Sequence, residues 1–483
     1  MFYHRLKEGT MTLIIFIAIL LPGFSFSQKI WTLEDCINYA LDNNLDIKKQ
    51  LLAVETNKAT LLQSKLGMLP DLNANATNVW NFGQTIDMYT NTFATNTVRS
   101  NNFYIQSSIV LFGGLQKFNT IKQNQLDLLA SKYDLDVLKN DISLAVAGYY
   151  LDILFNLELL DVAKGQLAIT QDEVVRISKK VEAGASAKGD LLNIQAQLSS
   201  EELTVIEAEN NLNISNLSLQ QLIDLPVTKD FIIEKPVLKE VGSPKELITP
   251  EIIFEHAVKI RPEIKSAELD VQSAQKFVAI SRGAVAPTLS FGGSWGTGYS
   301  GAAIELDPDI PPVITPYTIG ITQISRDSVI GFDVNHSTRV ISFKDQMRQN
   351  ENQSVGFYLS VPIFNGWQGR TAIAKAKIMA HQAELDLGIK IRDLRKLIEQ
   401  AYADAVASLK KFNSSKEKVK AQEESFNYTS QKFNVGMMTS FDYNNSKKDL
   451  TKAQSDLLQA KYNFLFKTTI LEFYMGNPIQ ITK

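Results

Sequence analysis

The sequence is poor in the residues that cross-link proteins or bind metals. Its 483 residues include one cysteine, Cys36, so neither an intrachain disulfide nor a cysteine-rich zinc site can form. Only four histidines are present and they lie far apart, which disfavours a clustered histidine metal site. The formal net charge is −3, without the basic surplus of nucleic-acid-binding proteins. The sequence therefore predicts no cofactor, no metal and no nucleic-acid partner.

Motifs of the common enzyme classes are missing as well. The chain has no Walker phosphate-binding loop, no HExxH zinc motif and no GxSxG nucleophile elbow. Its acidic residues are scattered along stretches with helical periodicity, where solvated charge is their common role. We therefore predict that the protein is not an enzyme.

An export signal is the first positive feature. A basic segment with Arg5 and Lys7 precedes the apolar run 13–21, and the small residues Ser25 and Ser27 suit cleavage after position 27. This order predicts a secretory signal peptide over residues 1–27, with a short buried helix as the alternative. No later apolar run reaches ~18 residues, so we expect an exported mature chain without a transmembrane helix.

The mature chain is an internal duplication. Residues 112–226 align with residues 364–478 at a constant shift of 252 positions, without gaps. The preceding segment repeats at a shift of 217, as in Pro70 and Pro287, so the second copy carries 35 additional residues. The predicted organisation is a signal peptide at 1–27, repeat one at 28–226, a linker at 227–247, repeat two at 248–478 and a C-terminal tail at 479–483.

Both repeats have the same predicted order of elements. A helical stretch (33–68 or 249–284) ends before a proline, because proline lacks an amide donor and restricts the preceding residue. A strand hairpin follows, and then a long helical hairpin that turns at Gly184 or Gly436. The strand hairpins are predicted at 71–112 and 288–364, with external loops at 83–100 and 297–353. The helical hairpins are predicted at 115–224 and 367–474.

The long helices carry an apolar residue at every seventh position. In the first of them these positions are Ile121, Leu128, Leu135, Ile142 and Tyr149. A seven-residue apolar repeat favours coiled-coil packing. The predicted fold class is therefore mainly α with a small antiparallel β part.

The strand segments alternate apolar and polar residues, as lipid-facing strands of a membrane barrel do. A soluble antiparallel sheet with one buried face is the alternative. Four strands per chain cannot close a barrel with a lumen, so closure requires several copies. The predicted lipid-facing positions are Phe103, Ile105, Ile109, Leu111, Phe291, Trp295, Val355, Phe357, Leu359 and Val361.

The duplicated pattern resembles the TolC-like outer-membrane efflux protein family over nearly the whole mature chain. The resemblance rests on WTLEDCINYALDNN (31–44), IVLFGG (109–114), VPIFNG (361–366) and two turn sequences. Those turns are VEAGASAKGDLLNIQAQL (181–198) and FNVGMMTSFDYNNSKKDL (433–450). Each motif is short, and the specificity comes from their duplicated order.

The resemblance implies an exit duct in the outer membrane of a tripartite efflux pump or a type I secretion system. The implied form is a homotrimer with a 12-stranded β-barrel in the membrane and a helical α-barrel tunnel in the periplasm. The implied partners are outer-membrane lipid, a periplasmic adaptor (membrane fusion) protein and an inner-membrane pump of the resistance-nodulation-division or ABC type. The transported substrate is not implied.

The resemblance also places functional residues at the two helical turns. The positions implied for adaptor docking are Gly184, Ala185, Gly436 and Met437, and those implied for a periplasmic gate are Asp190, Asp442, Asn445, Phe433 and Met438. From the residues alone, the two glycines are equally typical of helix C-caps, and Thr439-x-x-Asp442 resembles a capping box.

The gate positions depart from the family pattern. Met438 replaces an arginine, Phe433 a tyrosine and Asn445 an aspartate, so an Arg–Asp pair is not available to hold this gate shut. A trimer would still collect rings of Asp190 and Asp442, and such rings favour cations. The alternative function is an exported, envelope-spanning coiled-coil protein without a conduit, which would not need paired strands in each repeat.

Overall fold

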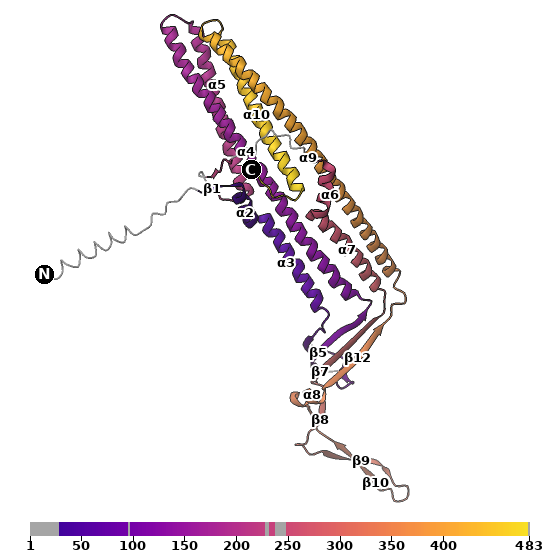
Figure 1. Cartoon of the computed structure of the whole chain (residues 1–483). Helices are drawn as coiled ribbons and strands as arrows, with labels where there is room; N and C mark the ends of the chain where they lie inside the picture. Colours follow the sequence, from indigo (N-terminus) through magenta and orange to yellow (C-terminus); the bar gives the residue numbers. More distant parts are fainter. Residues whose placement is uncertain (1–28, 95–96, 228–230, 237–247, 482–483) are drawn as a thin grey trace, which may run out of the picture. The chain divides into compact units, whose positions relative to one another are not determined.

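The computed structural model describes residues 29–94, 97–227, 231–236 and 248–481. The predicted signal peptide and most of the predicted linker therefore lie outside the described residues. Figure 1 shows the elements of the whole chain. The chain divides into two compact units. One unit comprises Met1–Glu55, Ala130–Glu268 and Asp386–Lys483, and the other comprises Thr56–Leu129 and Leu269–Leu385.

The helices of the two repeats begin and end at equivalent positions. α4 (Gln116–Glu182) and α9 (Gln368–Asn434) each have 67 residues, and their bounds differ by the 252 positions found in the sequence. α5 (Lys188–Leu222) and α10 (Ser440–Tyr474) each have 35 residues and obey the same shift. The shorter helices follow the shift of 217. α2 (Leu33–Asn43) corresponds to α6 (Pro250–Ile260), and α3 (Leu45–Leu66) corresponds to α7 (Pro262–Gly283).

Each predicted N-terminal helical stretch is broken into two helices. Asn44 separates α2 from α3, and its side-chain oxygen accepts the backbone N–H groups of Asp46 and Ile47 at 2.9 and 3.3 Å. Pro262 begins α7, because a residue without an N–H suits the first turn of a helix. The breaks at Asn44 and before Pro262 do not interrupt the apolar stripes of their segments, so periodicity alone did not predict these breaks.

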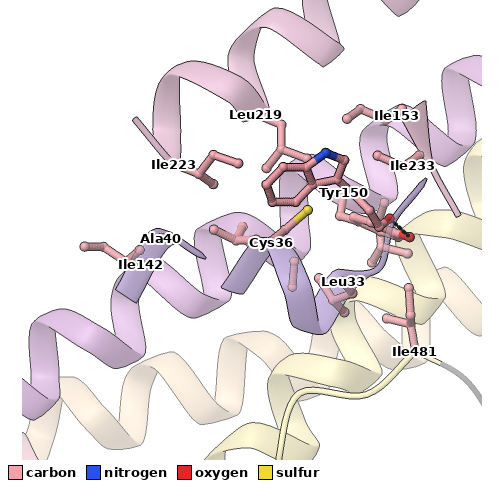
Figure 2. Close-up of a cluster of buried hydrophobic side chains, with 14 of the residues drawn as sticks. Leu33, Cys36, Ala40, Ile142, Tyr150, Ile153, Leu219, Ile223, Ile233 and Ile481 are labelled. Carbon is pink, nitrogen blue, oxygen red and sulfur yellow. Dashed lines mark hydrogen bonds between the residues drawn. The ribbon is translucent and has the colours of Figure 1, made fainter. Parts of the chain in front are cut away.

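The apolar core of repeat one lies where α2 meets α4 and α5 (Figure 2). Cys36 is fully buried there, and burial raises the pKa of its thiol to about 12, so the cysteine is a packing residue. The Tyr150 hydroxyl donates to the backbone carbonyl of Glu234 at 2.9 Å. β1 (Ile30–Trp31) pairs in parallel with β6 (Ile232–Ile233), which ties the start of this repeat to the segment after α5.

A second core occupies the corresponding places of repeat two. Ala257 and Ile264 are buried in it, as Ala40 and Ile47 are in the first core. Its remaining buried members are Ile253, Leu394, Ile398, Ala401, Ala405, Leu471 and Tyr474. The duplication therefore extends from sequence to packing.

The seven-residue stripe of α4 does not keep one face to its end. Leu135 and Ile142 are buried, but Tyr149 is 42% exposed and the adjacent Tyr150 is buried instead. A straight α-helix has 3.6 residues per turn, so a strict seven-residue repeat drifts around its surface. Within the chain, the buried stripe of α4 therefore continues from Ile142 to Tyr150 rather than to Tyr149.

Among the described residues, α4 alone has the length and composition of a membrane-spanning helix. These two properties are weak evidence, because the core helix of a water-soluble domain has them too. Several of its apolar residues, including Val146 and Ile153, lie buried in the first core.

A four-stranded antiparallel sheet belongs to the second unit. Its strand order is β12–β7–β5–β2, so the central pair joins β5 of repeat one to β7 of repeat two. β2 and β12 are edge strands with unpaired backbone groups. The strands are β2 (Asn73–Asn81), β5 (Val98–Gly113), β7 (Thr288–Ser300) and β12 (Asn352–Ser360).

The two connections that were predicted as external loops contain regular structure. A small hairpin of β3 (Thr85–Ile86) and β4 (Phe93–Ala94) lies between β2 and β5. The longer connection holds β8 (Ile304–Leu306), β9 (Val313–Ile321), β10 (Ser328–Asn335), β11 (Thr338–Val340) and the helix α8 (Phe343–Gln349). β9 pairs with β10, and β8 pairs with β11.

Candidate functional site

The two helical turns have the same backbone geometry. Gly184 and Gly436 have φ angles of +73° and +81°, in the left-handed region that favours glycine. The next N–H groups, of Ala185 and Met437, donate to the carbonyls of Lys180 and Lys432 at 2.7 and 2.8 Å. These bonds are those of a Schellman C-cap. The structure thus bears out the C-cap interpretation, and it leaves the predicted docking residues exposed at the turns.

Alanine at either turn is expected to destabilise it through the backbone. No other heavy atom lies within 4 Å of a Cβ built on Gly184 or Gly436, so the cost is the left-handed φ and amounts to about 1 kcal/mol. Gly189 is the matched control, because it is helical and equally open, and Gly189→Ala should stabilise by up to ~1 kcal/mol. Hydrogen exchange of the turn amides measures both effects, and equal exchange in the G184A and G189A variants would contradict this explanation.

The two predicted gate aspartates make different contacts. Asp442 forms the capping box of α10: its carboxylate accepts the Thr439 hydroxyl at 2.7 Å, and its N–H donates to the Thr439 oxygen at 3.2 Å. Asp190 instead accepts hydroxyls from Ser186 and Ser440, each at 3.0 Å. Since Ser440 begins α10, Asp190 links the start of α5 to the start of the equivalent helix in repeat two.

An apolar cluster lies between the same two helical hairpins. Phe433 stacks on Tyr443 with a centroid separation of 4.8 Å and an interplanar angle of 24°. Met438 packs against this pair, together with Ile177 and Ile194 of repeat one. Burial raises the pKa of Tyr443 to about 12, so its phenol stays neutral at ordinary pH. The structure thus places Phe433 and Met438 in a hydrophobic contact, while Asn445 is exposed.

A buried ion pair that the sequence analysis did not predict also joins these hairpins. Lys447 of α10 is 1% exposed, and its Nζ lies 2.9 and 3.1 Å from the two carboxylate oxygens of Glu201 of α5. The same ammonium donates to the Gln166 carbonyl of α4 at 2.8 Å and to the Thr170 hydroxyl. Burial lowers the pKa of Lys447, and hydrogen bonding to Glu201 opposes this shift.

The sequence did contain a signal for this lysine. Ser440, Tyr443, Lys447, Leu450 and Ala453 are all buried and are spaced by three or four residues. A lysine at a core position of this stripe needs a buried acceptor. The acidic residues of the helical stretches, to which Glu201 belongs, were instead predicted to be solvated.

The sheet has one apolar face, and the strand register defines it. Ile105 lies opposite Trp295, Ile109 opposite Phe291, and Phe291 in turn opposite Phe357. Directly opposed residues share a face. By the same register, Phe103, Val355 and Leu359 lie on this face as well.

Three of the predicted lipid-facing positions, Leu111, Val361 and Phe103, differ from the others in their local structure. A bulge between Val110 and Phe112 places Phe112 opposite Leu289, so Leu111 is the additional residue of the bulge. Val361 lies beyond the end of β12. Phe103 packs edge-on against Phe343 of α8 at 6.5 Å between centroids, so protein covers part of the apolar face at this end.

Sequence and structure comparisons agree on the relatives of this chain. The model of the family described as outer membrane efflux protein matches residues 36–224 and 254–477. Outer membrane protein TolC of Escherichia coli (strain K12) is 20% identical over 466 residues, which cover 96% of this chain and 85% of TolC. Outer membrane efflux protein BepC of Brucella suis biovar 1 is 19% identical over 361 residues, which cover 74% of this chain and 68% of BepC. The crystal structure of CusC has a TM-score of 0.73 at 16% identity and covers 92% of each chain.

The chain belongs to the outer membrane efflux protein family, since the family match spans both repeats. It is an efflux protein of the outer membrane, as the sequence resemblance predicted. The predicted fold class, mainly α with a small antiparallel sheet, is confirmed by the structure and by its likeness to CusC.

Proposed function

We propose that the chain is one third of a homotrimeric exit duct. The main support for this proposal is the four-stranded sheet, which has one apolar face and two open edges, at β2 and β12. Joining β2 of one copy to β12 of the next closes a barrel. Two copies would give eight strands, whose interior side chains largely fill, whereas three copies give twelve strands and a wider interior. The apolar face then meets lipid and the polar face lines the lumen. The alternative function, a coiled-coil protein without a conduit, would not require such a sheet.

In this proposal the helical hairpins extend into the periplasm and receive an adaptor protein at their turns. Gly184, Ala185, Gly436 and Met437 are the proposed docking residues, and the exposure of their turns supports this role. The adaptor in turn connects the duct to an inner-membrane pump of the resistance-nodulation-division or ABC type. The duct itself conducts passively and carries out no catalysis.

The proposed gate lies where the hairpins of the two repeats meet. The hydrogen bond from Ser440 to the Asp190 carboxylate and the contact of Phe433 and Met438 support closure by packing and hydroxyl–carboxylate hydrogen bonds rather than by an Arg–Asp pair. Three copies of Asp190 and Asp442 would surround the opening. Asn445, which is exposed, would add an uncharged polar group there.

Conductance in planar bilayers tests the duct and its charge ring. We expect purified protein to run as a trimer and to give stepwise conductance with a preference for cations. The Asp190→Asn/Asp442→Asn variant should lose much of this preference, because carboxylate rings attract cations. Asp449→Asn is the control, since this exposed residue lies further along α10. Absence of conductance would refute the duct, and an unchanged preference in the double variant would refute the ring.

A further inference from the structure

The helix α8 has a fixed place at one end of the four-stranded sheet. The side chain of Gln346, which is 1% exposed, accepts the Ser300 N–H at 2.8 Å and donates to the Ser300 carbonyl at 2.9 Å. The Thr297 hydroxyl donates to the Met347 carbonyl at 2.6 Å. Ser300 is the last residue of β7, whereas Gly113, after which α4 begins, pairs with the first. α8 therefore lies at the end of the sheet away from α4.

α8 has one side on the sheet and a basic side away from it. The Phe343 ring lies 5.5 Å from that of Tyr299 and 6.5 Å from that of Phe103, measured between centroids. By the strand register, both partners belong to the apolar side of the sheet. Lys344 and Arg348 are exposed and four residues apart, so they share one side of α8, here called the basic side. This side is opposite to Gln346 and points away from the proposed lumen.

Contacts within the chain do not explain the two cations of the basic side. The ion pairs formed in the described part of the chain include neither Lys344 nor Arg348. Asp345, between them in sequence, instead accepts the Ser342 hydroxyl at 2.5 Å. A lysine in the first turn of a helix also lies at the positive end of the helix dipole, so Lys344 does not stabilise α8. The basic side is therefore available to an anionic partner.

The position of α8 along the sheet indicates where this partner lies. The indole N–H of Trp295, on the apolar face, donates to the Glu351 carboxylate at 2.9 Å. An apolar ring with a polar tip is typical of the boundary between hydrocarbon and head groups. Thr297, which holds α8, is two residues further along β7, about 7 Å from Trp295. The head-group layer is roughly 5–7 Å thick on each side of the bilayer, so α8 lies at its level.

The chemistry of the basic side matches that of a phosphorylated membrane surface. A guanidinium binds phosphate with paired hydrogen bonds, and an ammonium binds it as a point charge. Phe343 is 48% exposed, so part of its ring remains for acyl chains below the head groups. Resting on the proposed function, we propose that the basic side of α8 binds phosphate groups of lipid head groups in the outer leaflet. Lys344 and Arg348 hold the phosphates, and the helix anchors the outer end of the barrel.

Thermal dissociation of the purified trimer tests this binding. The trimer is placed in vesicles of phosphatidylcholine alone or mixed with phosphorylated lipid A. Lipid A should raise the dissociation temperature, and the Lys344→Gln/Arg348→Gln variant should lose most of this rise. Lys448→Gln/Lys452→Gln, which alters an exposed pair with the same spacing on α10, should keep it. An equal rise in wild type and K344Q/R348Q overturns the proposal, as does an equal rise caused by inorganic phosphate in detergent.

Fluorescence quenching in the same vesicles tests the level of α8. A bimane label on Lys344→Cys should be quenched more by nitroxides on lipid head groups than by nitroxides deep in the acyl chains. A label on Phe357→Cys should show the reverse order, and the buried Cys36 adds little background. If neither nitroxide quenches the F357C label, the barrel of the proposed function fails. If the F357C label is quenched and the K344C label is not, or if K344C cross-links to a second copy, only the docking of α8 on lipid fails.

Discussion

Replacing Lys447 by methionine is expected to destabilise the contact between the two helical hairpins by about 3–5 kcal/mol. The methionine fills much of the lysine volume, but it leaves the Glu201 carboxylate without its ammonium partner. It also removes the donor to the Gln166 carbonyl. Hydrogen exchange along α5 and α10, with thermal unfolding of the whole protein, measures the effect.

Two further variants make this prediction specific. Lys448→Met alters the adjacent, exposed lysine and should change stability by no more than ~0.5 kcal/mol. The double variant Lys447→Met/Glu201→Gln should recover much of the loss, because no buried charge then lacks its partner. If K447M and K448M unfold alike, the buried ion pair contributes nothing to this contact.

Arginine in place of Phe357 is expected to impair assembly in the outer membrane. Phe357 lies on the apolar face of β12, with its ring 5.0 Å from that of Phe291. An arginine on the lipid face costs about 2–4 kcal/mol at the bilayer midplane and less near the interfaces. Membrane fractionation and heat-modifiable migration of the trimer report the loss of inserted protein.

Tyr358 is the matched control for this substitution. It is the next residue of the same strand, is also exposed, and points to the polar face opposite Ser290. Tyr358→Arg should therefore insert normally. Equal insertion of the F357R and Y358R variants would contradict the assignment of the two faces.

The duplication made the fold predictable from the sequence. Every described helix except α8, and each strand of the four-stranded sheet, is encoded twice, so a weak pattern such as that of residues 355–363 gains support from its counterpart at 103–111. The insertion in repeat two has no counterpart, and its short elements, including β9 and α8, were predicted only as a loop. Turn residues such as Gly184 were identified because their backbone requirement is local.

The contacts at the candidate gate were harder to predict. Lys447 and Glu201 are 246 positions apart, and neither residue alone indicates its partner. Asp190 and Asp442 occupy equivalent positions, yet one bridges two hairpins and the other caps its own helix. Such differences depend on side chains contributed by the other repeat, which the duplicated pattern does not specify.

The central strand pair of the sheet has a consequence for the covalent connection between the repeats. β5 and β7 belong to different repeats, and their paired residues run from Ser100 to Gly113 on β5. The Lys447–Glu201 pair joins the same two repeats near the helical turns. The two repeats are thus joined by non-covalent contacts at two separate places, in addition to the peptide chain that connects them. In evolutionary terms, fusing two copies of an ancestral gene would have fixed their ratio and order, while non-covalent pairing supplied the adhesion.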